Sequence, residues 1–128
     1  MIADLRPDHV RATDQKLRIM LIEDEAILAM DLSHSLTELG YQICSVARTR
    51  AEAIHSAVLT RPDLIICDVI LADASCGERA VDDILGQIGP RPVIFITSGP
   101  IVAREGPFRH VSKPFMIEDI DMAICQLI

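Results

Sequence analysis

Four short stretches of the chain place side chains suited to chemistry directly at the end of an apolar run. They hold carboxylates, a hydroxyl and an ammonium: Glu23, Asp24 and Glu25 after the first run, Asp68 after the third, Thr97 after the fourth and Lys113 after the fifth. Carboxylates gathered in one crevice repel one another, and a hard divalent cation with oxygen ligands relieves that repulsion. A hydroxyl and an ammonium on the opposite side suit the oxygens of a phosphoryl group during transfer. The residue types therefore predict a Mg²⁺ site combined with phosphoryl transfer, with Glu25 left as a solvated or capping acid.

The elements that must position these residues alternate along the chain. Apolar runs at 17–22, 43–46, 63–68, 93–97 and 108–112 are short enough to be strands. The segments between them carry apolar residues at helical spacing: Ile27, Leu28, Leu32, Leu36 and Leu39; Ala53, Ile54, Ala57 and Val58; Ala80, Val81, Ile84, Leu85 and Ile88; Ile117, Ile120, Ile124 and Leu127. Gly40 is a stop for the first helix, and Thr49 is an N-cap for the second.

This alternation predicts an α/β fold with a parallel sheet, because strand–helix–strand units connect parallel neighbours by right-handed crossovers. The functional crevice of such a sheet lies at the carboxyl ends of its strands, where all four stretches end. The segment 98–107 contains Pro100 and ends in Pro107, so it has room for at most a short helical turn. We therefore expect four full helices, with the fourth crossover helix short or missing.

Composition narrows the class of protein. The 128 residues fit one domain at 17–128 after a flexible lead-in at 1–16, and the net charge of −7 argues against a nucleic-acid surface. No apolar run approaches the ~18 residues that span a bilayer, so no membrane contact is expected. Four cysteines without a C-x-x-C pair favour a reducing, cytoplasmic compartment, and Cys76 is interpreted as a plain loop residue.

From residue 17 to residue 128 the chain resembles the response-regulator receiver domains of bacterial two-component systems. The motifs that carry the resemblance are the runs 21–25, 64–68, 94–98 and 111–115. The resemblance implies a flavodoxin-like, doubly wound five-stranded sheet in the order 2-1-3-4-5. It also implies a signalling phosphoacceptor, which is no enzyme beyond catalysing its own phosphorylation and dephosphorylation.

The same resemblance assigns roles to individual residues. Asp68 would be the phosphoacceptor, Thr97 and Lys113 would hold the phosphoryl oxygens, and the Lys113–Pro114 bond would be cis. Mg²⁺ would be held by Glu23 through water, by Asp24 and Asp68 directly, and by the backbone carbonyl of Ile70. His110 stands where receivers commonly carry an aromatic switch residue that works with Thr97. An exposed histidine on an edge strand is an equally good interpretation.

Two departures from the common pattern narrow the resemblance. The run 70–77 after the acceptor is one residue longer than usual and lacks proline, and the fourth helix is nearly deleted. Both features are similar to receivers of the alphaproteobacterial general stress response, including the regulator that joins a sigma-factor-like domain to a receiver. The expected partners are a sensor histidine kinase or a histidine phosphotransfer protein, a downstream protein target or output domain, and a second copy in a weak homodimer.

Three other functions compete with this interpretation. A flavin carrier of the same topology needs a loop rich in hydroxyls and glycine after the first strand, where the acids 23–25 would repel a phosphate. A phosphatase with an aspartate nucleophile needs an Asp-x-Asp pattern there, and this chain begins that run with Glu23. A receiver-like module that binds a protein without phosphorylation stays open, although the five site residues disfavour it.

Overall fold

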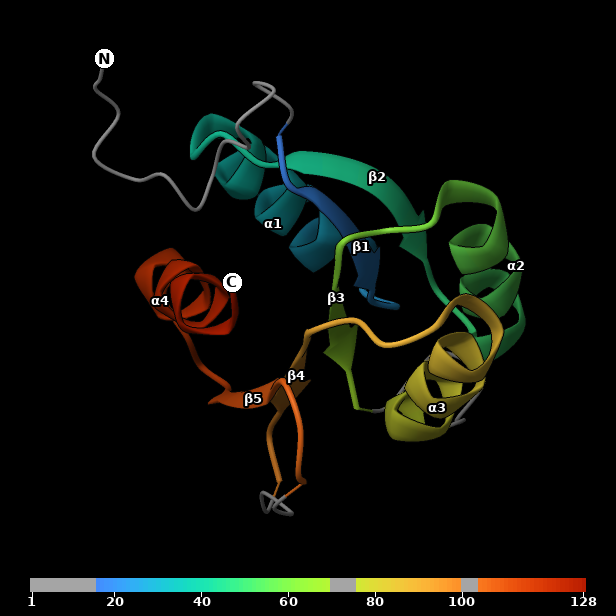
Figure 1. Cartoon of the computed structure of the whole chain (residues 1–128). Helices are drawn as coiled ribbons and strands as arrows, with labels where there is room; N and C mark the ends of the chain where they lie inside the picture. The colour runs from blue at the N-terminus through green and yellow to red at the C-terminus, as the bar shows by residue number, and fades with distance from the viewer. Residues whose placement is uncertain (1–15, 70–75, 100–103) are drawn as a thin grey trace.

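The computed structural model describes residues 16–69, 76–99 and 104–128 (Figure 1). In chain order the elements are β1 (Arg18–Ile22), α1 (Ala26–Glu38), β2 (Gln42–Ala47), α2 (Arg50–Thr60), β3 (Leu64–Asp68), α3 (Gly77–Ile88), β4 (Val93–Thr97), β5 (Phe108–Ser112) and α4 (Ile117–Leu127). The five strands are parallel and lie in the order β2-β1-β3-β4-β5. The predicted fold class and strand order are therefore confirmed.

Helices cover both faces of the sheet. In Figure 1, α1 and α4 lie on one side of the strands and α2 and α3 on the other. Alternate residues of each central strand point to opposite faces, so Met20 and Ile65 join the core beneath α2 and α3, whereas Leu21 and Ile66 join the core beneath α1 and α4. β3 and β4 are buried along their whole length, as expected from apolar runs that turn polar only at their last residues, Asp68 and Thr97.

The helix starts and stops follow local chemistry. The Thr49 hydroxyl accepts a hydrogen bond from the Glu52 amide at 3.2 Å, which confirms Thr49 as the N-cap of α2. Gly40 takes a φ of +103° just after α1, a conformation that glycine adopts without strain. Asp119 accepts from the Met116 amide at 2.9 Å and so caps the start of α4.

Two residues expected on buried helix faces lie at the surface instead. Ile27 is 84% exposed and Val58 is 40% exposed. The buried stripe of α1 runs through Ala29, Leu32 and Leu36. At about 100° per residue, Ile27 points almost opposite to Ala29, which is why its helical spacing was misleading.

The chain between β4 and β5 differs most from a regular doubly wound fold. Neither of its described parts, 98–99 and 104–107, is helical, and the described residues contain four helices, as expected. The expected lead-in at 1–16 falls outside the described residues except for Lys16. No helix in the described ranges combines the length and the apolar character that crossing a bilayer requires.

Candidate functional site

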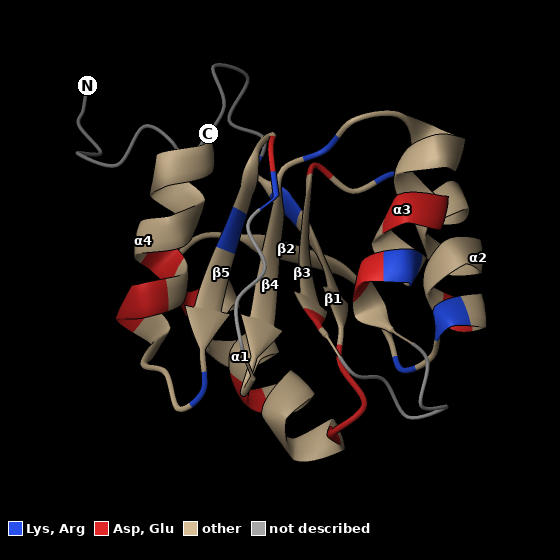
Figure 2. Ribbon diagram, turned by 90° about the horizontal axis from the view of Figure 1, so that it is seen from below, with Lys and Arg blue, Asp and Glu red and all other residues tan. Residues whose placement is uncertain are grey.

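The carboxyl ends of β1, β3, β4 and β5 bring the predicted residues to one edge of the sheet. Ile22 is paired with Cys67, so Glu23 and Asp68 follow side by side, and Thr97 is paired with Ser112, just before Lys113. In Figure 2, acidic segments drawn in red follow β1 and end β3, at the same edge where a blue basic residue follows β5. The parallel topology alone accounts for this convergence.

Three carboxylates form a compact acidic cluster at this edge. One oxygen each of Glu23, Asp24 and Asp68 lies within 4.8 Å of the others. Glu23 is 2% exposed and Asp68 is 8% exposed, so both carboxylates are largely withdrawn from water. Burial, followed by the charge of Asp68, raises the pKa of Glu23 to about 7.

The cluster fits a divalent cation. Oε2 of Glu23 accepts a hydrogen bond from the Glu25 amide at 3.1 Å, whereas Oε1 is buried and has no hydrogen-bond partner among the described residues. An unpartnered carboxylate oxygen beside two further carboxylates is a donor set that Mg²⁺ or a similar hard ion would complete. The backbone carbonyl of Ile70, the fourth expected ligand, lies outside the described residues.

Lys113 contacts Asp68, the predicted acceptor. Its Nζ donates to Oδ2 of Asp68 at 3.2 Å, and its backbone amide donates to the Thr97 carbonyl at 2.9 Å. Burial lowers the pKa of this lysine, but the hydrogen bond with Asp68 and the charges of Asp68 and Glu23 outweigh burial, so its pKa lies above the usual 10.5. The Lys113–Pro114 bond is cis, as expected.

Thr97 and His110 lie where the sequence placed them, each with a contact that the sequence did not predict. The buried hydroxyl of Thr97 accepts from the Gly99 amide at 3.0 Å, which ties it to the segment that follows β4. The His110 ring stacks on Phe95 with centroids 5.3 Å apart, so His110 is not a fully solvated histidine. Its role as a switch remains a prediction.

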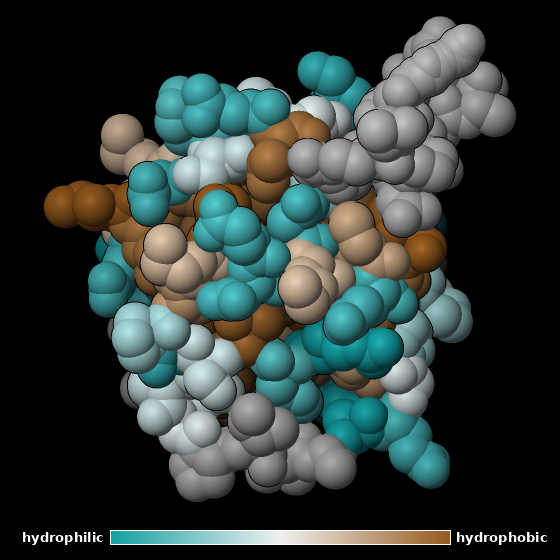
Figure 3. Space-filling view, turned by 90° about the vertical axis from the view of Figure 1, so that its left-hand side faces the viewer, coloured by the Kyte–Doolittle hydropathy of each residue, from teal (hydrophilic) through white to brown (hydrophobic). Residues whose placement is uncertain are grey.

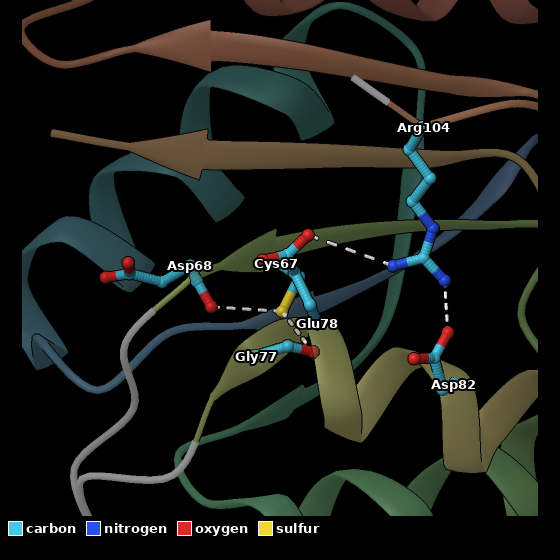
Figure 4. A network of polar contacts seen from close by, with 6 residues as sticks. All are labelled: Cys67, Asp68, Gly77, Glu78, Asp82 and Arg104. Atoms are coloured by element: carbon cyan, nitrogen blue, oxygen red, sulfur yellow. Dashed lines mark hydrogen bonds and ion pairs between the residues drawn. The ribbon is translucent and has the colours of Figure 1, made fainter. Parts of the chain in front are cut away.

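Two residues of this region were missed by sequence reasoning. At Gly77, the first residue of α3, a Cβ would lie 2.0 Å from the Asp68 carbonyl oxygen and 2.8 Å from Sγ of Cys67. That thiol donates to the same carbonyl at 3.1 Å (Figure 4). Arg104 spans from the β4–β5 connection to α3 in the same view. In the sequence, Gly77 stood out only as the end of the lengthened run 70–77, and Arg104 belongs to no recognisable motif.

Comparison with known proteins agrees with this geometry. Residues 19–125 match the response regulator receiver domain. Over 120 residues the chain is 41% identical to the phyllosphere-induced regulator PhyR of Methylorubrum extorquens, covering 90% of this chain and 45% of that protein. The chain thus spans less than half the length of this relative.

Solved structures of PhyR proteins are similar as well. The PhyR receiver domain of Erythrobacter litoralis has a TM-score of 0.78 at 37% identity, covering 87% of this chain and 88% of that one. The anti-anti-sigma factor PhyR of Bartonella quintana has a TM-score of 0.73 at 38% identity, over 90% of this chain and 49% of that one. The chain therefore belongs to the response regulator receiver family, and the predicted resemblance to the PhyR regulators of the alphaproteobacterial general stress response is confirmed.

Proposed function

We propose that this domain accepts a phosphoryl group on Asp68, with Mg²⁺ bound by the acidic cluster of Glu23, Asp24 and Asp68. One observation carries the proposal: the Asp68 carboxylate belongs to that acidic cluster and also forms an ion pair with the Lys113 ammonium, 3.2 Å away, at the carboxyl edge of the sheet. A nucleophile flanked by a cation site and a fixed ammonium is the arrangement that phosphoryl transfer needs.

In the proposed reaction an oxygen of Asp68 attacks the phosphorus of a phosphohistidine on a kinase or a phosphotransfer protein. The P–N bond breaks, its electron pair stays on the imidazole nitrogen, and an acyl phosphate forms on Asp68. When bound, Mg²⁺ would supply charge neutralisation for the phosphoryl oxygens. Lys113 neutralises the remaining charge, because it can exchange its bond to Asp68 for one to a phosphoryl oxygen.

The proposed output is a change in protein–protein interaction rather than a further chemical step. A phosphoryl group adds about two negative charges beside Thr97. The Thr97 hydroxyl accepts a hydrogen bond from the Gly99 amide, at the start of the β4–β5 connection. The resemblance to PhyR favours a general stress response pathway and a downstream partner or output domain within it. A weak homodimer is part of the same proposal.

The test is incubation with acetyl phosphate and Mg²⁺, followed by intact mass measurement. We expect one phosphoryl addition in the wild type, none without Mg²⁺ and none in Asp68→Asn. The matched control is Asp63→Asn, which changes an acid at the opposite end of the same strand, where Asp63 accepts a bond from the Arg18 amide. Labelling of Asp68→Asn at the wild-type level would disprove the acceptor. A wild type that takes no label would favour the module that binds protein without phosphorylation.

A further inference from the structure

Arg104 lies in the described part of the β4–β5 connection, 104–107, and its guanidinium sits over aromatic rings of β4 and β5. Its guanidinium forms an ion pair with Asp82 of α3 and lies 3.9 Å from Glu78 of the same helix. It also lies over the Phe108 ring at 4.6 Å and over the Phe95 ring at 5.4 Å from the centroids. Only 22% of the side chain is exposed, so these contacts are shielded in part from water.

These contacts reach the backbone of the acceptor. Glu78 directly follows Gly77, whose missing side chain leaves its Cα against the Asp68 carbonyl. Figure 4 shows Arg104 on one side of Glu78 and Gly77, at the start of α3, and Asp68 on the other. Arg104 therefore fastens the end of the β4–β5 connection to the helical turn that touches Asp68.

The beginning of the same connection is fastened to the phosphoryl-binding hydroxyl. The Gly99 amide donates to Oγ1 of Thr97 at 3.0 Å. If Thr97 is drawn toward a phosphoryl group on Asp68, either this bond breaks or the segment at 98–99 moves with it. Arg104, on the same connection, contacts Asp82 and Glu78 of α3, so a movement of residues 104–107 would have to break these contacts.

We propose that Arg104 is an autoinhibitory clasp that holds the β4–β5 connection on α3 and opposes the phosphorylated conformation. This inference rests on the proposed function of Asp68 and adds a regulatory element to it. A contact made only in the resting conformation lowers the population of the active one, so its removal must favour ligands that select the active conformation.

The experiment compares the affinity of each variant for beryllium fluoride in the presence of Mg²⁺, a non-transferable phosphoryl mimic. Arg104→Gln keeps a polar side chain but loses the charge, and it should bind the mimic about three- to tenfold more tightly than the wild type. Asp82→Asn should shift the affinity in the same direction by a smaller factor. The two changes together should give less than the product of their single effects, because they remove one shared contact.

Asp83→Asn is the matched control. Asp83 is the neighbour of Asp82 on α3 and forms an ion pair with Arg50 of α2, away from the β4–β5 connection. The affinity of Asp83→Asn for the mimic should equal that of the wild type. An Arg104→Gln affinity equal to or weaker than wild type would overturn the clasp, and so would an equal gain in Asp83→Asn, which would indicate a general loosening of α3.

A second measurement separates the clasp from the proposed phosphorylation. Amide hydrogen exchange without mimic should be several-fold faster in Arg104→Gln at 104–108 and in the first turns of α3, and unchanged in α2. Unchanged exchange at 104–108 and in α3 would overturn the clasp even if the wild type bound no mimic. Wild-type binding of the mimic without a gain in Arg104→Gln would overturn the clasp while leaving Asp68 as the acceptor. Arg104→Lys replaces Arg104→Gln if the latter is too unstable to study. It keeps the charge and loses the planar contact with Phe108, so its affinity for the mimic should exceed that of the wild type by a smaller factor than predicted for Arg104→Gln.

Discussion

At the scale of single residues, Glu23 is the group whose environment departs most from that of a surface acid. Its pKa rises to about 7 because burial and then the nearby Asp68 carboxylate disfavour its charged form. Mg²⁺ binds the charged form of such a carboxylate, so proton and metal compete for one site. This competition makes the site sensitive to pH in a range where ordinary carboxylates no longer titrate.

We expect the metal-free domain to lose stability as the pH rises from about 4.5 to about 7, through the ionisation of Glu23. In that window the unfolded chain has released the Glu23 proton and the folded chain has kept it, so raising the pH favours unfolding. The stability that depends on protonated Glu23 is fully present below about pH 4.5 and is lost above about pH 7. Mg²⁺ affinity should rise over the same window and then level off.

Urea denaturation and Mg²⁺ titration at a series of pH values measure both effects. The quantity to compare is the difference between the wild type and Glu23→Gln, because other groups titrate in the same range. Glu23→Gln should lack the decrease in the free energy of unfolding that the wild type shows between about pH 4.5 and about pH 7. If the two proteins follow the same pH profile, Glu23 is not the titrating group.

Gly77 provides a second prediction at the residue scale. Gly77→Ala places a Cβ against the Asp68 carbonyl oxygen, which belongs to backbone and yields little. We expect a loss of about 1–3 kcal/mol of stability in urea denaturation, together with slower phosphorylation of Asp68.

Gly86 is the control, since it lies on the same helix and has nothing within 4 Å of its Cβ position. Gly86→Ala should stabilise the domain by about 0.5–1 kcal/mol through helix propensity and leave phosphorylation unchanged. If Gly77→Ala left the free energy of unfolding unchanged, α3 would be able to move away from Asp68 at little cost.

At the scale of elements, the α4 helix is held by its apolar face and by polar contacts with other elements. Ile120 and Ile124 of α4 are fully buried against the sheet. The Tyr41 hydroxyl, at the start of β2, donates to Oδ1 of Asp121 at 2.6 Å. Tyr41 is itself fully buried, so this bond joins the α1–β2 junction to the last helix.

Tyr41→Phe should lower the free energy of unfolding by about 1–2 kcal/mol, because it removes a partly buried hydrogen bond to a charged group and keeps the ring. A double-mutant cycle with Asp121→Asn measures the coupling between the two side chains. Additive effects in that cycle would mean that the hydroxyl and the carboxylate do not stabilise the fold through each other.

At the scale of the whole molecule, the acidic cluster lies at one edge of the sheet. On the face drawn in Figure 3, hydrophilic and hydrophobic side chains are interspersed. An ion that binds to the acidic cluster of the folded domain is linked to global stability. A ligand that binds only the folded state stabilises it by about 2.7 kcal/mol at one hundred times its Kd.

Mg²⁺ should therefore raise the melting temperature of the wild type in a concentration-dependent way. Asp24→Ala should abolish most of this dependence, because it removes one carboxylate of the cluster. Asp31→Ala, an exposed acid on α1 outside the cluster, should respond to Mg²⁺ as the wild type does. A full Mg²⁺ response in Asp24→Ala would show that the ion binds elsewhere. Thermal unfolding followed by circular dichroism is sufficient for the comparison.

The fold class and the bounds of β4 and β5 could be predicted from the amino-acid sequence, and the strand order from the family resemblance. These features follow from local patterns: continuous apolar runs form buried strands, and a parallel sheet brings the carboxyl ends of its strands to one edge. The convergence of Glu23, Asp24, Asp68 and Lys113 could be predicted for the same reason, since each directly follows or ends a strand.

Contacts between side chains of distant segments could not be predicted from local sequence patterns. The exposure of Ile27, the contact of Gly77 with the Asp68 carbonyl and the stacking of His110 on Phe95 all depend on how separate elements pack. Arg104 shows the limit most clearly, because its partners come from α3, β4 and β5 and no local pattern encodes them. Periodicity reports the face of an element, whereas contacts between distant residues are set by the three-dimensional packing of those faces.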